Sequence, residues 1–144
     1  MTYAGALNGT SGNDVIVGTA GADNIDGNGG NDLICSGEGA DRVQGGFGND
    51  TIYLGGGADT ADGGAGTDTI FGGTGADRLD GSGDADVLCG QADADTLSGG
   101  TANDILDGGT QSDTLSGGAN ADTCYNGESV NCETTPAGNA PQCQ

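Results

Sequence analysis

A nine-residue motif repeats thirteen times without a change of phase through residues 9–125 of this 144-residue chain. Each copy opens with a glycine-rich run, has aspartate as its sixth residue, and continues with a short segment whose middle residue is apolar, as in residues 45–53, GGFGNDTIY. A glycine-rich turn followed by such a segment predicts a strand of about three residues. The repeat therefore determines the fold, and we number its copies as units 1 to 13.

The sixth position is the only invariant position of the motif. Its aspartates are Asp14, Asp23, Asp32, Asp41, Asp50, Asp59, Asp68, Asp77, Asp86, Asp95, Asp104, Asp113 and Asp122. The eighth position carries one small apolar side chain per unit, and this column is expected to form the core: Ile16, Ile25, Ile34, Val43, Ile52, Ala61, Ile70, Leu79, Leu88, Leu97, Leu106, Leu115 and Cys124. Glycine and aspartate suit turns of many kinds, but an acidic surface would not reserve one residue type for every ninth position.

The fifth position indicates that odd and even units face different environments. In the first eight units it reads Asn13, Ala22, Asn31, Ala40, Asn49, Ala58, Thr67 and Ala76, an alternation with a period of eighteen residues. Two units therefore form one turn of the structure, and aspartates eighteen residues apart are expected to stack. One column holds the aspartates of the odd units, and the other holds those of the even units.

The consensus GGxGxDxUx, in which U is aliphatic, resembles the calcium-binding nonapeptide of RTX proteins. One such motif is a weak signal, whereas thirteen in phase are specific. The resemblance implies an all-β fold, a right-handed parallel β-roll or β-solenoid with two short-stranded sheets, two nonapeptides per coil, and Ca²⁺ bound by the glycine-rich turns between coils. We expect a lead-in over residues 1–8, the roll over residues 9–125, and a cap or tail over residues 126–144.

Stacked carboxylates explain why such a roll needs a cation. Successive coils lie about 4.8 Å apart, where two carboxylates repel by roughly 1 kcal/mol in water and about 3 kcal/mol at an effective dielectric constant of 20. We expect the chain to remain unfolded without metal, because its small core cannot offset the entropy of ordering. The two columns contain eleven gaps. Each gap offers carboxylate and carbonyl oxygens in a flexible shell, which favours Ca²⁺ over Mg²⁺.

The resemblance also implies the ligands within a gap. Between units 5 and 7 they are the carboxylates of Asp50 and Asp68 and the carbonyl oxygens of Gly46, Gly48, Gly63 and Ala65. Between units 6 and 8 the same positions give the carboxylates of Asp59 and Asp77 and the carbonyl oxygens of Gly55, Gly57, Gly72 and Thr74.

The fourth position changes along the chain in a way that is expected to weaken the later sites. It is glycine in units 1 to 8 and then becomes Asp84, Asp93, Ala102, Gln111 and Asn120. If the position needs a positive φ, Ala and Gln are strained there. We therefore expect weaker calcium sites in the C-terminal third. The remaining acidic residues are interpreted as solvated surface: Asp26, Glu38, Asp62, Asp80, Asp84, Asp93, Asp107, Glu128 and Glu133.

The seventh and ninth residues of each unit are expected to point outward, and they differ between the two sheets. In the even units they are mostly polar, whereas in the odd units they include Val17, Leu33, Cys35, Tyr53, Phe71, Val87 and Cys89. We interpret this odd face as an interface through which the chain forms a dimer or filament, or packs on a missing domain. The alternative is that these residues reflect only the general preference of strands for β-branched and aromatic residues. The even strands of the same roll, however, do not show this composition.

The five cysteines permit several arrangements. Cys35 and Cys89 lie three coils apart on the odd face, about 14 Å by the strand spacing, which is too far for a bond within one chain. Two antiparallel copies could pair them twice, or both could be reduced strand residues. Near the end of the roll, Cys124 could pair with Cys132 and tie a cap over the last coil, or Cys132 could pair with Cys143.

Charge and composition narrow the class of protein. A net charge of −20 at pH 7 excludes nucleic acid and anionic lipid as natural partners, and the chain has no apolar run long enough to span a membrane. Residues 1–8 carry no signal peptide, but the resemblance is to proteins exported unfolded, so we expect an extracellular or cell-surface location. There is no histidine and no serine with a base nearby, so catalysis is not expected. The alternatives are a calcium-triggered folding and secretion module of a larger secreted toxin or hydrolase, and an adhesin or ice-binding domain.

Overall fold

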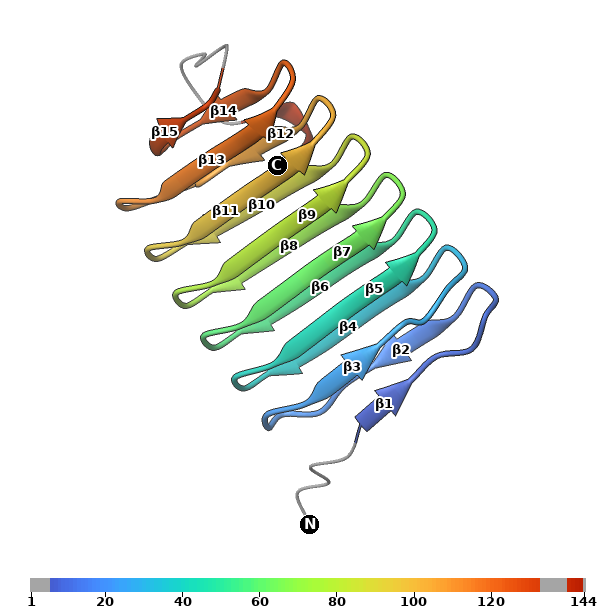
Figure 1. The fold of residues 1–144 in the computed structure, drawn as a ribbon. Coiled ribbons are helices and arrows are strands. Elements are labelled where there is room, and N and C mark those ends of the chain that lie inside the picture. The colour runs from blue at the N-terminus through green and yellow to red at the C-terminus, as the bar shows by residue number, and fades with distance from the viewer. Residues whose placement is uncertain (1–5, 133–139, 144) are drawn as a thin grey trace.

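The structure, a computed structural model, describes residues 6–132 and 140–143. It consists of short strands that wind as a solenoid from the N-terminal to the C-terminal end (Figure 1). The strands are β1(Ala6–Asn8), β2(Val15–Val17), β3(Asn24–Asp26), β4(Leu33–Glu38), β5(Arg42–Phe47), β6(Thr51–Gly56), β7(Thr60–Ala65), β8(Thr69–Thr74), β9(Arg78–Gly83), β10(Val87–Ala92), β11(Thr96–Thr101), β12(Ile105–Asp107), β13(Thr114–Ala119), β14(Thr123–Tyr125) and β15(Glu128–Val130), followed by the 3-10 turn η1(Pro141–Cys143). Among the described residues, no helix is long and apolar enough to cross a membrane.

Two parallel sheets face each other across the roll. The eight-stranded sheet has the order β1-β3-β5-β7-β9-β11-β13-β15, and the seven-stranded sheet has the order β14-β12-β10-β8-β6-β4-β2. Within the repeat, paired residues are eighteen positions apart, as in Ile34 with Ile52 and Val43 with Ala61. This register confirms the predicted all-β roll with two nonapeptides per coil.

Both ends of the eight-stranded sheet extend past residues 9–125. At the start, β1 pairs with β3 through Leu7 and Ile25. At the other end, β15 pairs with β13 through Thr114 and Glu128, which are fourteen rather than eighteen residues apart. The last coil is therefore four residues shorter than the others, and its turn lacks the repeat's aspartate.

Most of the strands are longer than the predicted three residues. β4 to β11 and β13 have six residues each, because each strand continues through the first three positions of the next unit. Since side chains alternate along a strand, the eighth position and the following first position both point inward. In β6 this places Ile52 and Leu54 in the core together, each fully buried.

The core is a single file of apolar side chains between the sheets. It comprises Ile25, Ile34, Val43, Ile52, Leu54, Ala61, Ile70, Leu79, Leu88, Leu97, Leu106, Leu115 and Cys124, with Leu7, Ile16 and Cys132 packed against its ends. The predicted column from Ile25 to Cys124 is thus confirmed, and Leu54 is an addition that the repeat pattern did not indicate. With so narrow a core, other contacts must help to hold the coils together.

One such contact explains the alternation at the fifth position. In the odd units the Asn side chain accepts a hydrogen bond from the backbone N–H one coil later: Asn31 N donates to Asn13 Oδ1 at 2.8 Å, and Asn49 N donates to Asn31 Oδ1 at 2.9 Å. Thr67 N donates to Asn49 Oδ1 at 3.1 Å. The ladder then stops, because Thr67 is not an amide, which is where the alternation in the sequence also blurs.

Candidate metal sites in the turns

The repeat aspartates stack in two columns inside the turns, as predicted. We call the edge with the turns of the odd units the odd edge, and the opposite one the even edge. From Asp32 onward, one carboxylate oxygen of each repeat aspartate accepts a hydrogen bond from the backbone of the aspartate one coil earlier. Asp50 N donates to Asp68 Oδ1 at 2.8 Å, and Asp59 N donates to Asp77 Oδ1 at 2.9 Å. All of these aspartates except Asp14 are buried.

The other carboxylate oxygen is buried without a hydrogen-bond partner in most turns. These oxygens are Oδ2 of Asp32, Asp41, Asp50, Asp59, Asp68, Asp77, Asp86, Asp95, Asp104, Asp113 and Asp122, and Oδ1 of Asp23. A buried carboxylate oxygen without a partner is costly. A regular row of such oxygens, one per turn, therefore points to a positively charged ligand or to protons that the turns are built to receive.

The glycine at the first position of most units lies close to the unpartnered oxygen. A Cβ added to Gly45 would lie 2.5 Å from Asp50 Oδ2 and 2.5 Å from the carbonyl oxygen of Gly63, one coil later. At the opposite edge, a Cβ on Gly72 would lie 2.6 Å from Asp77 Oδ2 and 2.7 Å from the carbonyl oxygen of Gly90. The glycine thus lets a carboxylate oxygen and a carbonyl oxygen of the next coil approach the same point, where a side chain would collide with both. These are the oxygen donors that Ca²⁺ prefers.

Burial raises the pKa of the aspartates in the middle of the columns. Desolvation is the main cause, and the charge of the neighbouring carboxylate adds to it, while the hydrogen bond from the preceding coil acts in the opposite direction. The pKa of Asp68 and Asp77 rises to about 7, that of Asp86 to about 8, and that of Asp95 and Asp104 to about 6. Without a bound cation, the turns therefore disfavour the ionised aspartates that a metal would need and would stabilise.

The predicted ligand set of a gap is brought together in part. Asp50 Oδ2 and Gly63 O border one space, whereas Ala65 O accepts a hydrogen bond from Gly48 N at 2.8 Å. In the gap between units 6 and 8, Thr74 O likewise accepts from Gly57 N at 2.9 Å. Among the residues the structure describes, no three acidic, histidine or cysteine side chains form a metal-binding group. An ion in these turns must therefore take backbone carbonyl oxygens as well as carboxylates.

The first two turns differ from the rest. Thr10 N donates to Asp14 Oδ2 at 2.6 Å and Thr10 Oγ1 donates to it at 2.9 Å, and Thr19 makes the same two bonds to Asp23 Oδ2. In these two turns, the threonine of the same loop thus donates hydrogen bonds to the carboxylate oxygen that has no partner in the later turns. The threonine at the second position, which only these two units have, is the signal in the sequence.

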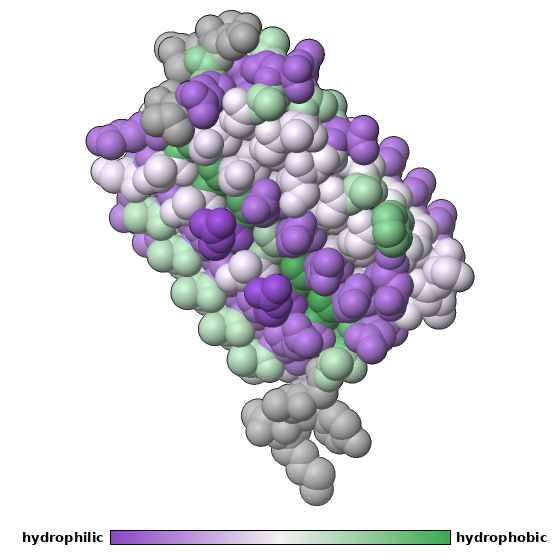
Figure 2. All heavy atoms as spheres, viewed as in Figure 1, coloured by the Kyte–Doolittle hydropathy of each residue, from purple (hydrophilic) through white to green (hydrophobic). Residues whose placement is uncertain are grey.

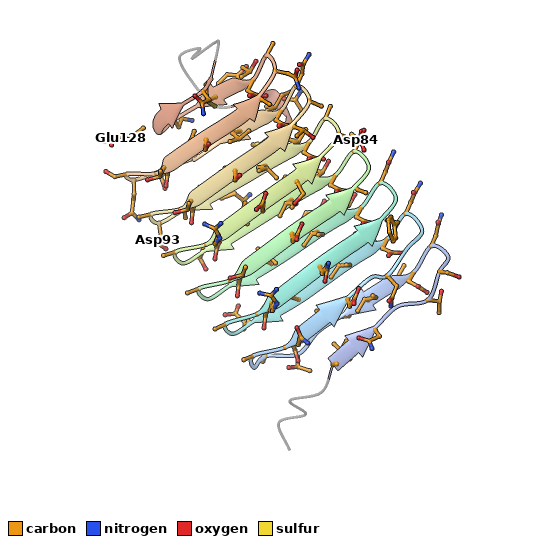
Figure 3. All side chains as sticks on the ribbon, viewed as in Figure 1. Asp84, Asp93 and Glu128 are labelled. Carbon is orange, nitrogen blue, oxygen red and sulfur yellow. A yellow bond between two sulfur atoms is a disulfide. The ribbon has the colours of Figure 1, made fainter. Side chains whose placement is uncertain are left out.

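From unit 3 onward, the second and fourth positions both have positive φ. The fourth position has φ of 81° at Ala102 and 85° at Gln111, so the predicted strain at these two residues is confirmed. The second position has φ of 78° at Gln91, a requirement that the sequence did not indicate. Asp84 and Asp93, also at the fourth position, project from turns at opposite edges of the roll (Figure 3).

The two outer faces differ as predicted. Hydrophilic and neutral side chains cover most of the eight-stranded sheet (Figure 2). On the seven-stranded sheet, Val15 is 73 % exposed, Val17 68 % and Tyr53 44 %, and the rings of Tyr53 and Phe71 stack with centroids 4.8 Å apart. We call the outward residues of β2, β4, β6 and β8 the apolar patch: Val15, Val17, Leu33, Cys35, Thr51, Tyr53, Thr69 and Phe71.

The patch ends at β10, where the C-terminal tail corrects three predictions. Cys89 forms a disulfide with Cys143, so neither the bond to Cys35 of a second copy nor the reduced state applies to Cys89. Cys89 is fully buried and cannot belong to an exposed interface, while Cys35 has a free thiol. Cys124 pairs with Cys132, as one prediction had it, and the pairing of Cys132 with Cys143 was wrong.

The third correction concerns Asp107, which is buried rather than solvated. Its carboxylate accepts hydrogen bonds from Ala140 N at 2.6 Å, Asn126 Nδ2 at 2.8 Å and Gly109 N at 3.1 Å. It therefore anchors the tail on the seven-stranded sheet beside the disulfide. Glu133, the last acidic residue, lies outside the described residues.

Comparison with known proteins supports the geometry of the turns. The profile of the RTX calcium-binding nonapeptide repeat matches the chain four times, at residues 8–43, 36–70, 62–97 and 98–129. A search of curated proteins found no significant match.

Proposed function

Because this chain belongs to the RTX calcium-binding nonapeptide repeat family, we propose that Ca²⁺ folds it into an extracellular structural module that associates with a second copy of itself. The observation that carries the first part of this proposal is the row of buried carboxylate oxygens without partners. Each needs a cation or a proton, and at neutral pH calcium supplies the charge in every turn that has room for it.

The chain's own oxygens provide the binding. Asp50 Oδ2 and the carbonyl oxygen of Gly63 would hold an ion between the two coils, with further carbonyl oxygens of the same turns completing the shell. An ion shared between two coils removes the repulsion between stacked carboxylates and links the coils directly. Folding and binding are then one event, since the turns that create the sites exist only in the folded roll.

Calcium binding also makes association favourable. The metal-free chain has a net charge of −20, which keeps copies apart. One divalent ion in each of the eleven gaps would bring that charge close to zero. The apolar patch contains no charged side chain, so two copies can meet there without burying a carboxylate. Its valines and the stacked Tyr53 and Phe71 would supply the buried area.

The two disulfides support an extracellular location. Cys89–Cys143 and Cys124–Cys132 both tie the C-terminal tail to the roll, and such bonds persist in oxidising compartments. Calcium is scarce in the cytosol, so the chain would stay unfolded until export.

Sedimentation velocity in calcium and in EDTA tests the assembly. The wild-type chain is expected to sediment as a compact dimer or larger species in calcium and as an expanded monomer in EDTA. Tyr53→Lys should leave a compact monomer in calcium, because it places a charge in the apolar patch. Gln44→Lys, the matched change on the exposed surface of the eight-stranded sheet, should still associate. A wild-type chain that remains monomeric in calcium at high concentration would contradict self-association and leave calcium-driven folding standing.

A further inference from the structure

The two edges of the roll differ at the first position of their turns. On the odd edge this position is glycine in every unit: Gly9, Gly27, Gly45, Gly63, Gly81, Gly99 and Gly117. On the even edge it reads Gly18, Ser36, Leu54, Gly72, Gly90 and Gly108. Two neighbouring even turns therefore carry a side chain where every other turn of the repeat has none.

Space, rather than backbone conformation, explains the glycine at this position. None of these glycines has the positive φ found at the second and fourth positions. Instead, the added Cβ would collide with the unpartnered carboxylate oxygen of the same turn and with the carbonyl oxygen one coil later, as at Gly45. Any side chain here occupies the space between the two oxygens that a cation would bridge.

Ser36 and Leu54 fill that space in different ways. Both are fully buried. Ser36 Oγ donates a hydrogen bond to the carbonyl oxygen of Leu54 at 2.7 Å, and this carbonyl is the one that faces the carboxylate in a glycine turn. Leu54 belongs to the apolar core, and by the strand register it stands opposite Gly72, in the gap between Asp59 and Asp77.

We propose that these two gaps hold no calcium: Ser36 closes the gap between Asp41 and Asp59, and Leu54 closes the gap between Asp59 and Asp77. This inference rests on the proposed calcium binding and changes its count, from eleven ions to at most nine. The odd edge keeps glycine at the first position of every unit, whereas the row of glycines on the even edge is broken at units 4 and 6. There the coils are joined by the Leu54 side chain and the Ser36 hydrogen bond. Asp59 borders both closed gaps and therefore has no ion on either side.

Counting bound Ca²⁺ by native mass spectrometry tests the proposal. Leu54→Gly reopens a gap and is expected to bind one ion more than the wild-type chain. Leu54→Ala is the matched control, because it removes the same core packing but keeps the Cβ that blocks the space, and it should bind the wild-type number. The reverse change, Gly45→Ala on the odd edge, should bind one ion fewer, because its Cβ would meet Asp50 Oδ2 and the carbonyl oxygen of Gly63. The φ of Gly45 is not positive and adds no strain of its own, and Ser36 and Leu54 show that the roll accommodates a Cβ at this position.

A second pair of variants does not depend on the core. Asp59→Asn is expected to leave the ion count unchanged, whereas Asp50→Asn should lose at least one ion. Eleven ions in the wild-type chain, equal counts for Leu54→Gly and Leu54→Ala, or loss of an ion in Asp59→Asn would each overturn the proposal. If the wild-type chain bound no calcium at all, the proposed function itself would be wrong, and the two failures are therefore distinguishable.

Discussion

Acid should be able to replace calcium in folding this chain, because the buried aspartates can be neutralised by protons as well as by metal. The pKa of Asp86 rises from 3.8 to about 8, a difference of about four units, which corresponds to about 5 kcal/mol. The whole stability of a domain is about 5–15 kcal/mol, and Asp68 and Asp77 add similar penalties. We therefore expect these ionised carboxylates to keep the roll unfolded in EDTA at pH 8.

The direction of the pH effect follows from which state binds more protons. Between about pH 4 and pH 8 the folded state holds protons that the unfolded chain has lost, so the free energy of unfolding falls as pH rises through this range. Lowering the pH from 8 to 5.5 in EDTA should therefore increase the β-sheet signal in far-UV circular dichroism and raise the urea midpoint. With calcium present, the same change should weaken the fold, since protons then compete with the metal.

One pair of variants separates the effect of ionising a buried aspartate from the effect of negative charge in general. Asp86→Asn removes the ionisation and should stabilise the metal-free form at pH 8 by up to about 5 kcal/mol. Asp84→Asn changes an exposed carboxylate in the same turn. Its charge is the smallest of the causes that raise the pKa of Asp86, and burial is the largest, so this variant should change the pH dependence much less. The reasoning is refuted if the metal-free chain shows no gain of structure on acidification, or if the two variants behave alike.

Three further predictions concern the C-terminal part. Ala102→Gly should stabilise the calcium-bound roll by roughly 1 kcal/mol, because φ is 81° at this residue and a side chain is strained there. An unchanged thermal midpoint would count against strain at this position. Asp107→Ala should lower the stability of the folded roll by about 1–3 kcal/mol, because it leaves the backbone N–H of Ala140 without its acceptor. Hydrogen exchange at Ala140 should then accelerate. Unchanged exchange would mean that other contacts hold the tail. Cys89→Ser opens a loop of 54 residues and should lower the stability of the folded roll by about 4 kcal/mol. Urea unfolding in calcium measures this loss. An effect below about 1 kcal/mol would contradict a stabilising role of the Cys89–Cys143 disulfide.

Much of the fold could be predicted because the repeat constrains it so strongly. A column of aliphatic residues with a period of nine and an alternation with a period of eighteen were enough to predict the register and the stacking of Asp50 on Asp68. The two parallel sheets were implied by the resemblance to the RTX nonapeptide. The strand length was wrong, because the glycines that follow each apolar segment favour a turn by propensity. In the roll they are held as strand by pairing with equivalent residues in the adjacent coils, as in Gly55 with Gly37 and Gly73.

The remaining errors come from contacts outside the repeat. Leu54 stands at the first position of its unit, where most units have glycine, and its inward direction is visible only once β6 is known to have six residues. Asp107 and Cys89 occupy outward positions of the repeat, and nothing in the periodicity indicates that a tail segment more than thirty residues later covers them. Spacing alone gave the correct Cys124–Cys132 bond as one option, because the last core position and the start of the cap must lie close together.

The most direct test of the account is a calcium titration of the metal-free chain at pH 7.5, followed by far-UV circular dichroism. We predict an unfolded spectrum in excess EDTA, a cooperative gain of β-structure as calcium is added, and a return to the unfolded spectrum on chelation. Ordered β-structure that persists in excess EDTA at this pH would show that the stacked carboxylates do not need a cation, and would contradict the central claim.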